Sequence, residues 1–314
     1  MDLEKDAIDI LQTFSGSDPY QLGYSGGKDS DVILHLAKKS GVKFVAVHNH
    51  TTVDAPETGY YIREKVKRGE VVIEKPKESM WQLIVRHKTP PTRKMRYCCA
   101  DLKEYSGIGK KLITGVRKYE STNRSENQGI ITFTKPNKEI KGYVDGVRQK
   151  GVINGQITIY GTEERSGDVN FHLTNRGVII LNYENSETHR IVENCYRTSK
   201  TLINPILEWD DEYLWWYIRR NEITINPLYK GGCGGGCGRI GCIGCPMSGR
   251  GREKEFAIYP QYKHLYIKTF ERMLEYRKQC GNKDVIGWKT AQGVFDWWME
   301  DKNIEGQMEL RDFI

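Results

Sequence analysis

The stretch GYSGGKDSDVILHL, residues 23–36, decides the fold of this chain. The residues YQLG at 20–23 have the pattern of a short strand that leads into a turn with two adjacent glycines. After the turn, the apolar residues Val32, Ile33 and Leu36 recur at the spacing of one helix face. The sequence therefore predicts a strand, a glycine-rich turn and the start of a helix in direct succession.

Such a succession forms a site for an anion. Glycine lets backbone N–H groups approach an oxyanion without a Cβ in the way, and the helix N-terminus adds unpaired donors and partial positive charge. Lys28 contributes a full charge, although the spacing differs from the Walker pattern. We therefore expect phosphate binding by Ser25, Gly26, Gly27, Lys28, Asp29 and Ser30.

The first third of the chain alternates between strand-like and helix-like patterns. VKFVAVHNH at 42–50, EVVIEKP at 70–76 and KLITGVR at 111–117 are apolar runs typical of buried strands. GYYIREKVKRG at 59–69 has a helical pattern between two of them. Strands separated by helices predict an α/β fold, with a parallel sheet and helices on both faces.

The pattern changes near Ser125, where glycine, threonine and β-branched residues in short alternations replace the helical periodicity. Helical patterns return after Asn204. The sequence predicts three segments: a nucleotide-binding α/β core at 1–125, a β-rich insertion at 126–185, and a segment at 186–314 that completes the core and adds a helical C-terminal region with a cysteine-rich loop.

The composition is that of a globular protein with an ample core. The 314 residues are 38% hydrophobic and 28% charged, and 48 Lys and Arg against 41 Asp and Glu give a net charge of +7. This mild excess suits a polyanionic partner such as a nucleotide or nucleic acid. No run has the pattern of a signal peptide or a membrane span, so we expect a cytoplasmic protein without a membrane partner.

Six of the eight cysteines fall into two groups, which suggests metal binding in a reducing compartment. Cys98 and Cys99 are adjacent, and the second group comprises Cys233, Cys237, Cys242 and Cys245. The C-x-x-C spacing of the last two lets both thiolates reach one metal or cluster. Thiolate coordination fits zinc and an iron–sulfur cluster equally, so the residues alone leave both open. We expect the isolated Cys195 and Cys280 to be packed thiols.

Several motifs occur in the order found in one known family. SGGKDS resembles the pyrophosphate loop (PP-loop) of the adenine nucleotide alpha-hydrolase superfamily, and further stretches resemble its phosphoadenosine phosphosulfate (PAPS) reductase branch. These stretches are VDAPETGYYI at 53–62, RYCCADLK at 96–103, GVRKYESTNR at 115–124, NPILEWDDEYLWWYI at 204–218 and GCIGCPMSGRGREKEF at 241–256. The resemblance covers most of the chain outside roughly 130–180.

The resemblance implies a Rossmann-like fold of the HUP type that binds ATP or PAPS at the carboxyl ends of the strands. Asp54 and Glu57 would help to hold Mg²⁺ or substrate, and Arg117 and Arg124 would pair with phosphate or sulfate. Gly115 opens the motif that contains both arginines. The residues expected to act in catalysis are Lys28, Asp29, Asp54, Arg117 and Cys99.

For the cysteines, the resemblance favours a 4Fe-4S cluster over zinc. Sulfonucleotide reductases use a Cys-Cys pair with a C-x-x-C, which here would be Cys98, Cys99, Cys242 and Cys245. Proteins similar to the ATP pyrophosphatase of DNA phosphorothioation instead carry one early cysteine and a C-x8-C-x2-C group, which would be Cys98, Cys233, Cys242 and Cys245. The fourth ligand is therefore Cys99 or Cys233, and Cys237 is spare in both assignments.

Two departures from the reductase pattern favour ATP-dependent sulfur transfer. Assimilatory reductases usually have an altered loop and a C-terminal cysteine nucleophile, whereas this loop is intact and no cysteine follows Cys280. The expected reaction cleaves ATP to AMP and pyrophosphate, adenylates an acceptor and thiolates it. The cluster or a cysteine persulfide would carry the sulfur, the persulfide on Cys99 or Cys237, whichever is not a ligand, and a cysteine desulfurase would be the donor. The alternatives are a PAPS or adenylyl-sulfate reductase that releases sulfite, and a non-catalytic regulatory protein that binds nucleotide and cluster.

Basic residues flank both cysteine groups and predict DNA or RNA as the sulfur acceptor. They are dense in RHKTPPTRKMRY at 86–97 and in SGRGREK at 248–254. We expect the nucleic-acid backbone to contact Arg93, Lys94, Arg250 and Arg252. The alternative is a solvated basic surface that only helps to hold the nucleotide.

Overall fold

The computed structural model describes residues 2–103, 109–120, 128–134, 141–144, 147–150, 152–153, 156–157, 171–174, 177–180, 200–230, 240–283, 285 and 288–300. Within these residues, no helix is both long and apolar enough to cross a membrane. The chain forms two compact units: unit 1 comprises residues 1–48, 61–73 and 106–226, and unit 2 comprises residues 49–60, 74–105 and 227–314.

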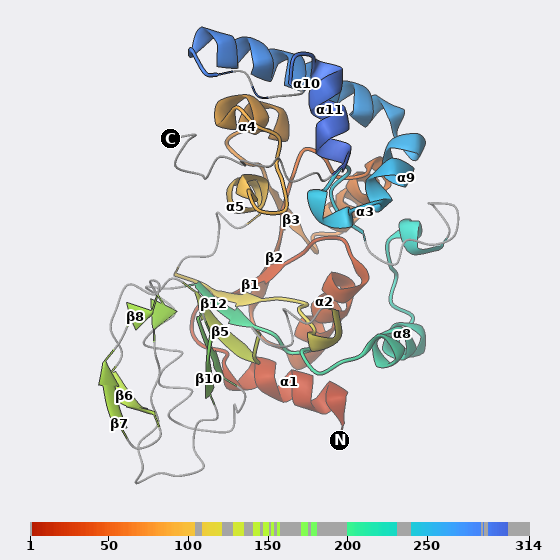
Figure 1. Ribbon diagram of the computed structural model, residues 1–314. Helices are drawn as coiled ribbons and strands as arrows, with labels where there is room; N and C mark the ends of the chain where they lie inside the picture. The colour runs from red at the N-terminus through yellow and green to blue at the C-terminus, as the bar shows by residue number, and fades with distance from the viewer. Residues whose placement is uncertain are drawn as a thin grey trace. The chain divides into compact units, whose positions relative to one another are not determined.

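An eight-stranded sheet has the strand order β10-β11-β5-β12-β4-β1-β2-β3 (Figure 1). Its strands are β1 Tyr20–Gly23, β2 Phe44–Asn49, β3 Val72–Glu74, β4 Lys111–Ile113, β5 Ile131–Thr134, β10 Phe171–Thr174, β11 Gly177–Ile180 and β12 Lys200–Ile203. The pairs β12–β4, β4–β1 and β1–β2 are parallel, as the sequence predicts. The pairs β12–β5, β5–β11 and β11–β10 are antiparallel, so the sheet is mixed rather than wholly parallel.

The expected Rossmann-like α/β fold is confirmed, and its antiparallel part comes from the stretch predicted to be rich in strands. That stretch also holds two hairpins, formed by β6 Lys141–Val144 with β7 Val147–Lys150 and by β8 Val152–Ile153 with β9 Gln156–Ile157. The boundaries of the three predicted segments stay a prediction.

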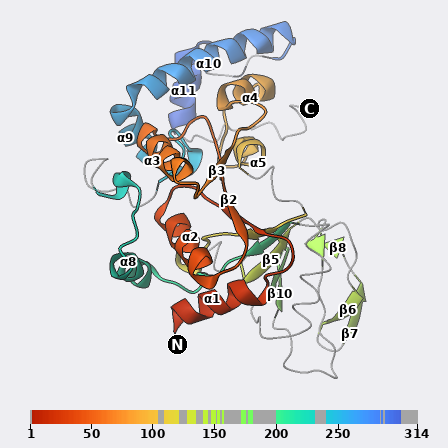
Figure 2. The same ribbon diagram turned by 180° about the vertical axis from the view of Figure 1, so that it is seen from behind.

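In unit 1, helices α1 Leu3–Thr13, α2 Lys28–Ser40 and α8 Asp211–Arg220 pack around the sheet, with α2 in contact with α1, β1 and α8 (Figures 1 and 2). Asp2 caps α1 by accepting a hydrogen bond from the Lys5 N–H, and α2 ends at Gly41 in the left-handed conformation. The α2 face predicted to be apolar is buried, with Val32, Ile33 and Leu36 fully enclosed. Helix α3 Pro56–Lys67 has residues in both units.

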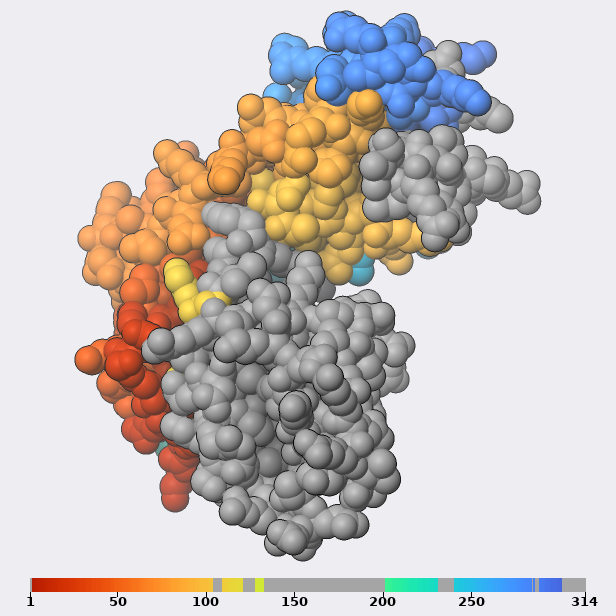
Figure 3. Space-filling view, turned by 90° about the vertical axis from the view of Figure 1, so that its left-hand side faces the viewer, coloured from red at the N-terminus to blue at the C-terminus, as the bar shows by residue number. Residues whose placement is uncertain are grey.

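Unit 2 has its own hydrophobic core. It contains α4 Met80–His87, α5 Tyr97–Leu102, α9 Gly251–Ile258, α10 Pro260–Gln279 and α11 Ala291–Glu300. Ser79 and Gln82 form a reciprocal capping box at the start of α4. The blue α10 lies over the orange α4 region (Figure 3), and rings of Tyr266, Phe270 and Trp298 fill the space between α10 and α11. Short 3₁₀ turns complete the described elements: η1 Lys118–Glu120, η3 Pro227–Lys230 and η4 Pro246–Ser248.

Candidate functional site

The SGGKDS loop of unit 1, at 25–30, has the backbone that the sequence predicts. Strand β1 ends at Gly23, and Gly26 has a φ of 76°, a left-handed value that glycine adopts without steric cost. Gly27 is the N-cap of α2, and the first helical bond runs from Asp31 N–H to Gly27 O over 3.1 Å. The N–H groups ahead of Asp31 thus have no partner within the helix, and they carry the positive end of its dipole.

Hydrogen bonds hold the loop in this shape. The Ser30 hydroxyl donates to Gly27 O over 2.7 Å, and the Gly27 N–H donates to Ser25 Oγ over 3.3 Å. The Asn226 amide donates to Gly26 O over 3.2 Å. The loop is therefore organised by its own residues and by Asn226, which belongs to none of the motifs recognised in the sequence.

Four charged side chains lie at the first turn of α2. Lys28 Nζ is 3.2 Å from Asp29 Oδ2 and 3.6 Å from Asp211 Oδ1. The Arg117 guanidinium donates to Asp29 Oδ1 over 2.6 Å, to Asp211 Oδ1 over 2.8 Å and to the Trp209 carbonyl over 3.2 Å. The motif beginning at Gly115 thereby meets the loop motif in space.

Gly115 explains why this meeting is so close. A Cβ at this position would lie 2.9 Å from Asp29 Cβ, a distance that side chains essentially never show. Arg117, which the sequence predicts as a phosphate ligand, is buried and engaged with two carboxylates and a carbonyl. Its observed contacts hold Asp29 and Asp211. Arg124 lies outside the described residues.

A buried carboxylate directly behind the loop is not among the site residues that the sequence predicts. Asp31 Oδ1 accepts hydrogen bonds from the Tyr24 hydroxyl over 2.5 Å and the Tyr61 hydroxyl over 2.8 Å, with Lys65 Nζ at 4.0 Å. Burial raises the pKa of Asp31 to about 6, against the opposing effect of these bonds and of Lys65. Tyr24 and Asp31 flank the SGGKDS motif directly, and this position is the signal that could have identified them.

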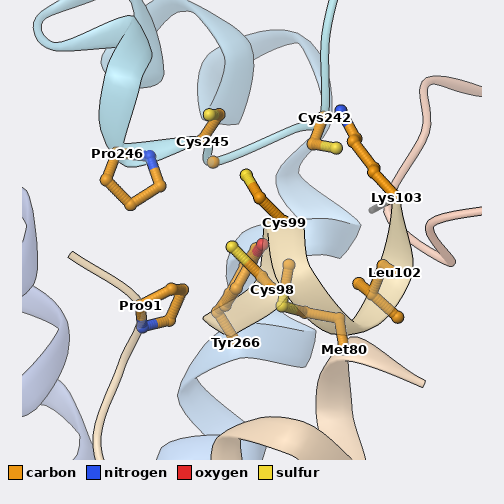
Figure 4. Close-up of a pocket in the computed structure, with 11 residues that line it drawn as sticks. Met80, Pro91, Cys98, Cys99, Leu102, Lys103, Cys242, Cys245, Pro246 and Tyr266 are labelled. Atoms are coloured by element: carbon orange, nitrogen blue, oxygen red, sulfur yellow. The ribbon is translucent and has the colours of Figure 1, made fainter. Parts of the chain in front are cut away.

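Four cysteines of unit 2 line one cavity. Cys98 and Cys99 come from α5, and Cys242 and Cys245 come from the loop ahead of η4 (Figure 4). Cys99 extends from its helix toward Cys242 and Cys245 (Figure 4). The other lining residues are mostly apolar: Met80, Pro91, Leu102, Lys103, Gly244, Pro246 and Tyr266. Cys233 and Cys237 lie outside the described residues.

Positive charge lies beside these thiols. The pKa of Cys99 is lowered because the Cys98 thiol donates a hydrogen bond to it and the Arg96 guanidinium lies 3.3 Å from its Sγ. The same thiol–thiol bond and burial raise the pKa of Cys98. Lys103 lies beside Cys242 (Figure 4), whose charge raises the pKa of Lys103.

Gly244 lets the Cys242–Cys245 loop turn against the core of unit 2. It has a φ of 75°, and a Cβ there would lie 2.8 Å from Phe256 and 2.9 Å from Tyr266. Its N–H donates to Glu255 Oε2 over 2.7 Å. The neighbouring Ile243 N–H donates to Val53 O over 2.8 Å.

Asp54 and Glu57 belong to this unit as well. Asp54 forms a backbone bridge with Cys242, and its Oδ2 accepts from the Thr51 N–H over 3.1 Å. Glu57 accepts from the Tyr259 hydroxyl over 2.8 Å. In the part of the chain that the structure describes, no group of three or more His, Cys, Asp or Glu side chains could hold a metal ion as it stands.

The basic segments beside the cysteines separate into exposed and buried members. Arg93, Lys94 and Arg250 are exposed, and Arg93 Nε donates to Pro246 O over 3.2 Å. The expectation that Arg252 contacts a nucleic acid is wrong. Its side chain is fully buried, and its guanidinium donates to the carbonyls of α11.

Comparison with known proteins identifies a family. The family model of the phosphoadenosine phosphosulfate reductase domain matches residues 19–248. An uncharacterized protein of Methanocaldococcus jannaschii is 23% identical over 310 residues, which cover 94% of this chain and 57% of that protein. The chain therefore spans somewhat more than half the length of this curated relative.

Solved structures with similarity to the chain include a PAPS reductase from Candida auris in a phosphate complex. It is 14% identical, with a TM-score of 0.39 over 75% of this chain and 87% of that chain. FMN adenylyltransferase from Candida glabrata, with FMN and an ATP analogue, is 12% identical, with a TM-score of 0.37 over 77% of this chain and 63% of that chain.

Proposed function

The chain belongs to the phosphoadenosine phosphosulfate reductase domain family, and from this premise we propose that it catalyses ATP-dependent sulfur transfer. The family supports nucleotide binding and sulfur-related chemistry. One observation carries the choice of ATP: the complete SGGKDS loop at 25–30 forms a glycine turn ahead of α2, with Lys28 at its first turn. Backbone donors, a helix dipole and a lysine suit the pyrophosphate that leaves when ATP is cleaved between its α and β phosphates.

In the proposed reaction, an acceptor oxygen attacks the α-phosphorus and the bond to the β-phosphate oxygen breaks. The electron pair leaves with pyrophosphate, whose charge the loop N–H groups and Lys28 stabilise. A hydrosulfide, released from the cysteine persulfide by a thiol reductant that supplies two electrons and is itself oxidised to a disulfide, then attacks the adenylated acceptor atom. AMP leaves with the acceptor oxygen, and the sulfur takes its place.

The four cysteines around one cavity support a 4Fe-4S cluster as the second component. The donor set fits because each thiolate of such a cluster binds its own iron, so the thiols need not converge on one ion as they would for zinc. Cys98, Cys99, Cys242 and Cys245 would hold it, and the cluster would supply a binding place for sulfur. With Cys99 in the ligand set, the role of persulfide carrier falls to Cys237.

The residues predicted to hold Mg²⁺ do not fit it as they stand. Asp54 and Glu57 each accept a hydrogen bond from a residue of their own unit. Within the described residues, they belong to no group of three or more His, Cys, Asp or Glu side chains that could hold a metal ion. We assign no step to Mg²⁺ held by these residues.

The acceptor that we propose is a nucleic acid, and a cysteine desulfurase is the proposed sulfur donor. Arg93, Lys94 and Arg250 are exposed in the unit that holds the cysteines, and the chain has a net charge of +7. Such side chains suit a phosphate backbone. A small acceptor that needs no basic surface is the alternative.

A second candidate, sulfonucleotide reduction, has one observation in its favour. Cys98 and Cys99 line the same cavity as Cys242 and Cys245, and a Cys-Cys pair with a C-x-x-C is the pattern of reductases. Such an enzyme would release sulfite from PAPS or adenylyl sulfate.

Transfer of labelled sulfur tests the proposal. Anaerobically purified protein is incubated with ³⁵S-cysteine, a cysteine desulfurase, a thiol reductant, ATP and DNA or RNA. We expect ³⁵S in the nucleic acid only when ATP is present, and loss of the label in Lys28→Met. Release of labelled sulfite from ³⁵S-PAPS, with no ATP-dependent labelling of any acceptor, would favour the reductase.

A further inference from the structure

We propose that Asp211 is an internal anion of the phosphate site, which a nucleotide must displace before its phosphates reach Lys28. The inference rests on the proposed function in one respect only, that this loop binds the phosphates of a nucleotide. It assigns to Asp211 the control of affinity at that site.

One oxygen of Asp211 serves both cations of the site. Oδ1 is 2.8 Å from Arg117 Nη2 and 3.6 Å from Lys28 Nζ. Two cations and the two carboxylates of Asp29 and Asp211 therefore balance in charge when no nucleotide is bound. A phosphate oxygen that approaches Lys28 meets an ammonium group already next to carboxylates.

The exposure of the four side chains shows which carboxylate can leave. Arg117 and Lys28 are only 2% and 8% exposed, whereas Asp211 is 72% exposed. Asp29 is 20% exposed and is held by Arg117 Nε and by its close approach to Gly115. Asp211 can therefore rotate into water with a small loss of free energy, because its side chain is already mostly solvated. Lys28 and Arg117 would then share the single carboxylate of Asp29, unless another anion took the place of Asp211.

The position of Asp211 in α8 lets its side chain move without disturbing the start of the helix. Asp210 is the N-cap of the helix and accepts the Tyr213 N–H over 2.7 Å, so movement of Asp211 leaves the cap in place. Glu212 is the next residue, is exposed, and belongs to the same first turn. It provides a matched carboxylate for comparison.

The test measures binding of inorganic pyrophosphate and of a non-hydrolysable ATP analogue by calorimetry. We expect Asp211→Asn to bind both about threefold to fivefold more tightly than the wild type, the gain from removing one partly exposed ion-pair competitor. Glu212→Gln removes the same charge one residue away and should stay close to the wild type. In the Lys28→Met background, Asp211→Asn should lose most of its effect.

The outcomes separate the two proposals. If the wild type binds pyrophosphate and Asp211→Asn binds it equally or more weakly, the displacement inference is overturned and the nucleotide site stands. Weaker binding would show in addition that Asp211 is a positioning residue for Lys28. An equal gain in affinity in Glu212→Gln would also overturn it, because the loss of any negative charge near the site would then explain both variants. Absence of binding in every variant would overturn this inference together with the proposed function. Thermal unfolding confirms that each variant is folded.

Discussion

At Gly115, a hydrogen atom occupies the place where any other residue would put a carbon 2.9 Å from Asp29 Cβ. This close approach joins two motifs that lie far apart in the sequence, because Arg117 follows two residues later and pairs with Asp29. At the residue scale, the proposed phosphate site is thus a set of charged side chains, and the absence of a side chain at Gly115 sets how closely this segment approaches Asp29.

Substitution of Gly115 tests this arrangement. Gly115→Ala should destabilise the protein by about 1–3 kcal/mol through overpacking and should weaken ATP binding, because Asp29 must shift. Gly23→Ala is the matched control, since its Cβ would meet only Ile113 O at 3.7 Å. Unchanged ATP affinity in Gly115→Ala by calorimetry would show that the position of Asp29 is unimportant.

Asp31 should make stability depend on pH. Its pKa of about 6, raised by burial from 3.8, means that the folded protein binds this proton more tightly than the unfolded chain. Its contribution to stability therefore falls as pH rises from about 4 to about 6 and is level above that range. Asp31→Asn removes this loss, so the stability of the variant relative to the wild type should rise by about 3 kcal/mol across the same window.

Urea unfolding of both proteins at several pH values measures this difference. The comparison cancels the titration of all other groups that the substitution leaves unchanged. A difference that stays flat between pH 4 and pH 7 would mean that Asp31 titrates normally.

At the scale of elements, the cysteine loop depends on its packing against α9, α10 and α11. Gly244 stands between Ile243 and Cys245, where its left-handed φ and the rings of Phe256 and Tyr266 admit no side chain. The turn sets the direction of Cys245 relative to Cys242, so the packing of Gly244 against these rings determines whether the two thiols share a cavity.

Iron content tests this dependence. Anaerobic wild-type protein should hold about four irons per chain with broad absorbance near 400 nm, as thiolate ligation of a cluster predicts. Gly244→Ala should lose most of both signals, as should Cys242→Ser and Cys245→Ser. Gly251→Ala, whose Cβ would meet only Ser248 Cβ at 3.6 Å, should keep them. A full iron content in Gly244→Ala would contradict the packing argument.

Individual strands, turns and helices were predictable because each is encoded by residues that are close together in the sequence. The strand, the glycine turn and the apolar face of α2 follow one another within residues 20–36, and the cysteine pairs could be recognised from spacing. The meeting of distant segments was not predictable. Nothing near Arg117 indicates that Asp211 will meet it, and nothing near Arg252 shows that its charge will be enclosed by the carbonyls of α11.

At the scale of the molecule, the net charge of +7 is the feature that suits a polyanionic partner larger than a nucleotide. The exposed members of the basic segments belong to the unit that holds the cysteines, and the buried Arg252 does not contribute to that surface. A partner recognised by charge would therefore meet Arg93, Lys94 and Arg250.

Salt dependence tests this partner. Replacing Arg93, Lys94 and Arg250 together with glutamine should weaken binding to DNA or RNA and reduce the slope of log affinity against log salt by about 0.7–0.9 for each phosphate that the variant no longer neutralises. Binding of ATP should change little. Replacing Lys38, Lys39 and Lys67, three basic residues of unit 1, provides a control of equal charge. Equal weakening of nucleic-acid binding in both triple variants would contradict a specific basic surface.

The most direct test of the central claim is the identity of the phosphorus products formed from ATP. Anaerobic protein with ATP, a hydrosulfide source and nucleic acid is followed by ³¹P NMR. The proposal predicts that AMP and pyrophosphate form in equal amounts, and that neither forms with Lys28→Met. Formation of ADP and inorganic phosphate, or an ATP spectrum that stays unchanged while the same preparation releases sulfite from PAPS, would contradict it.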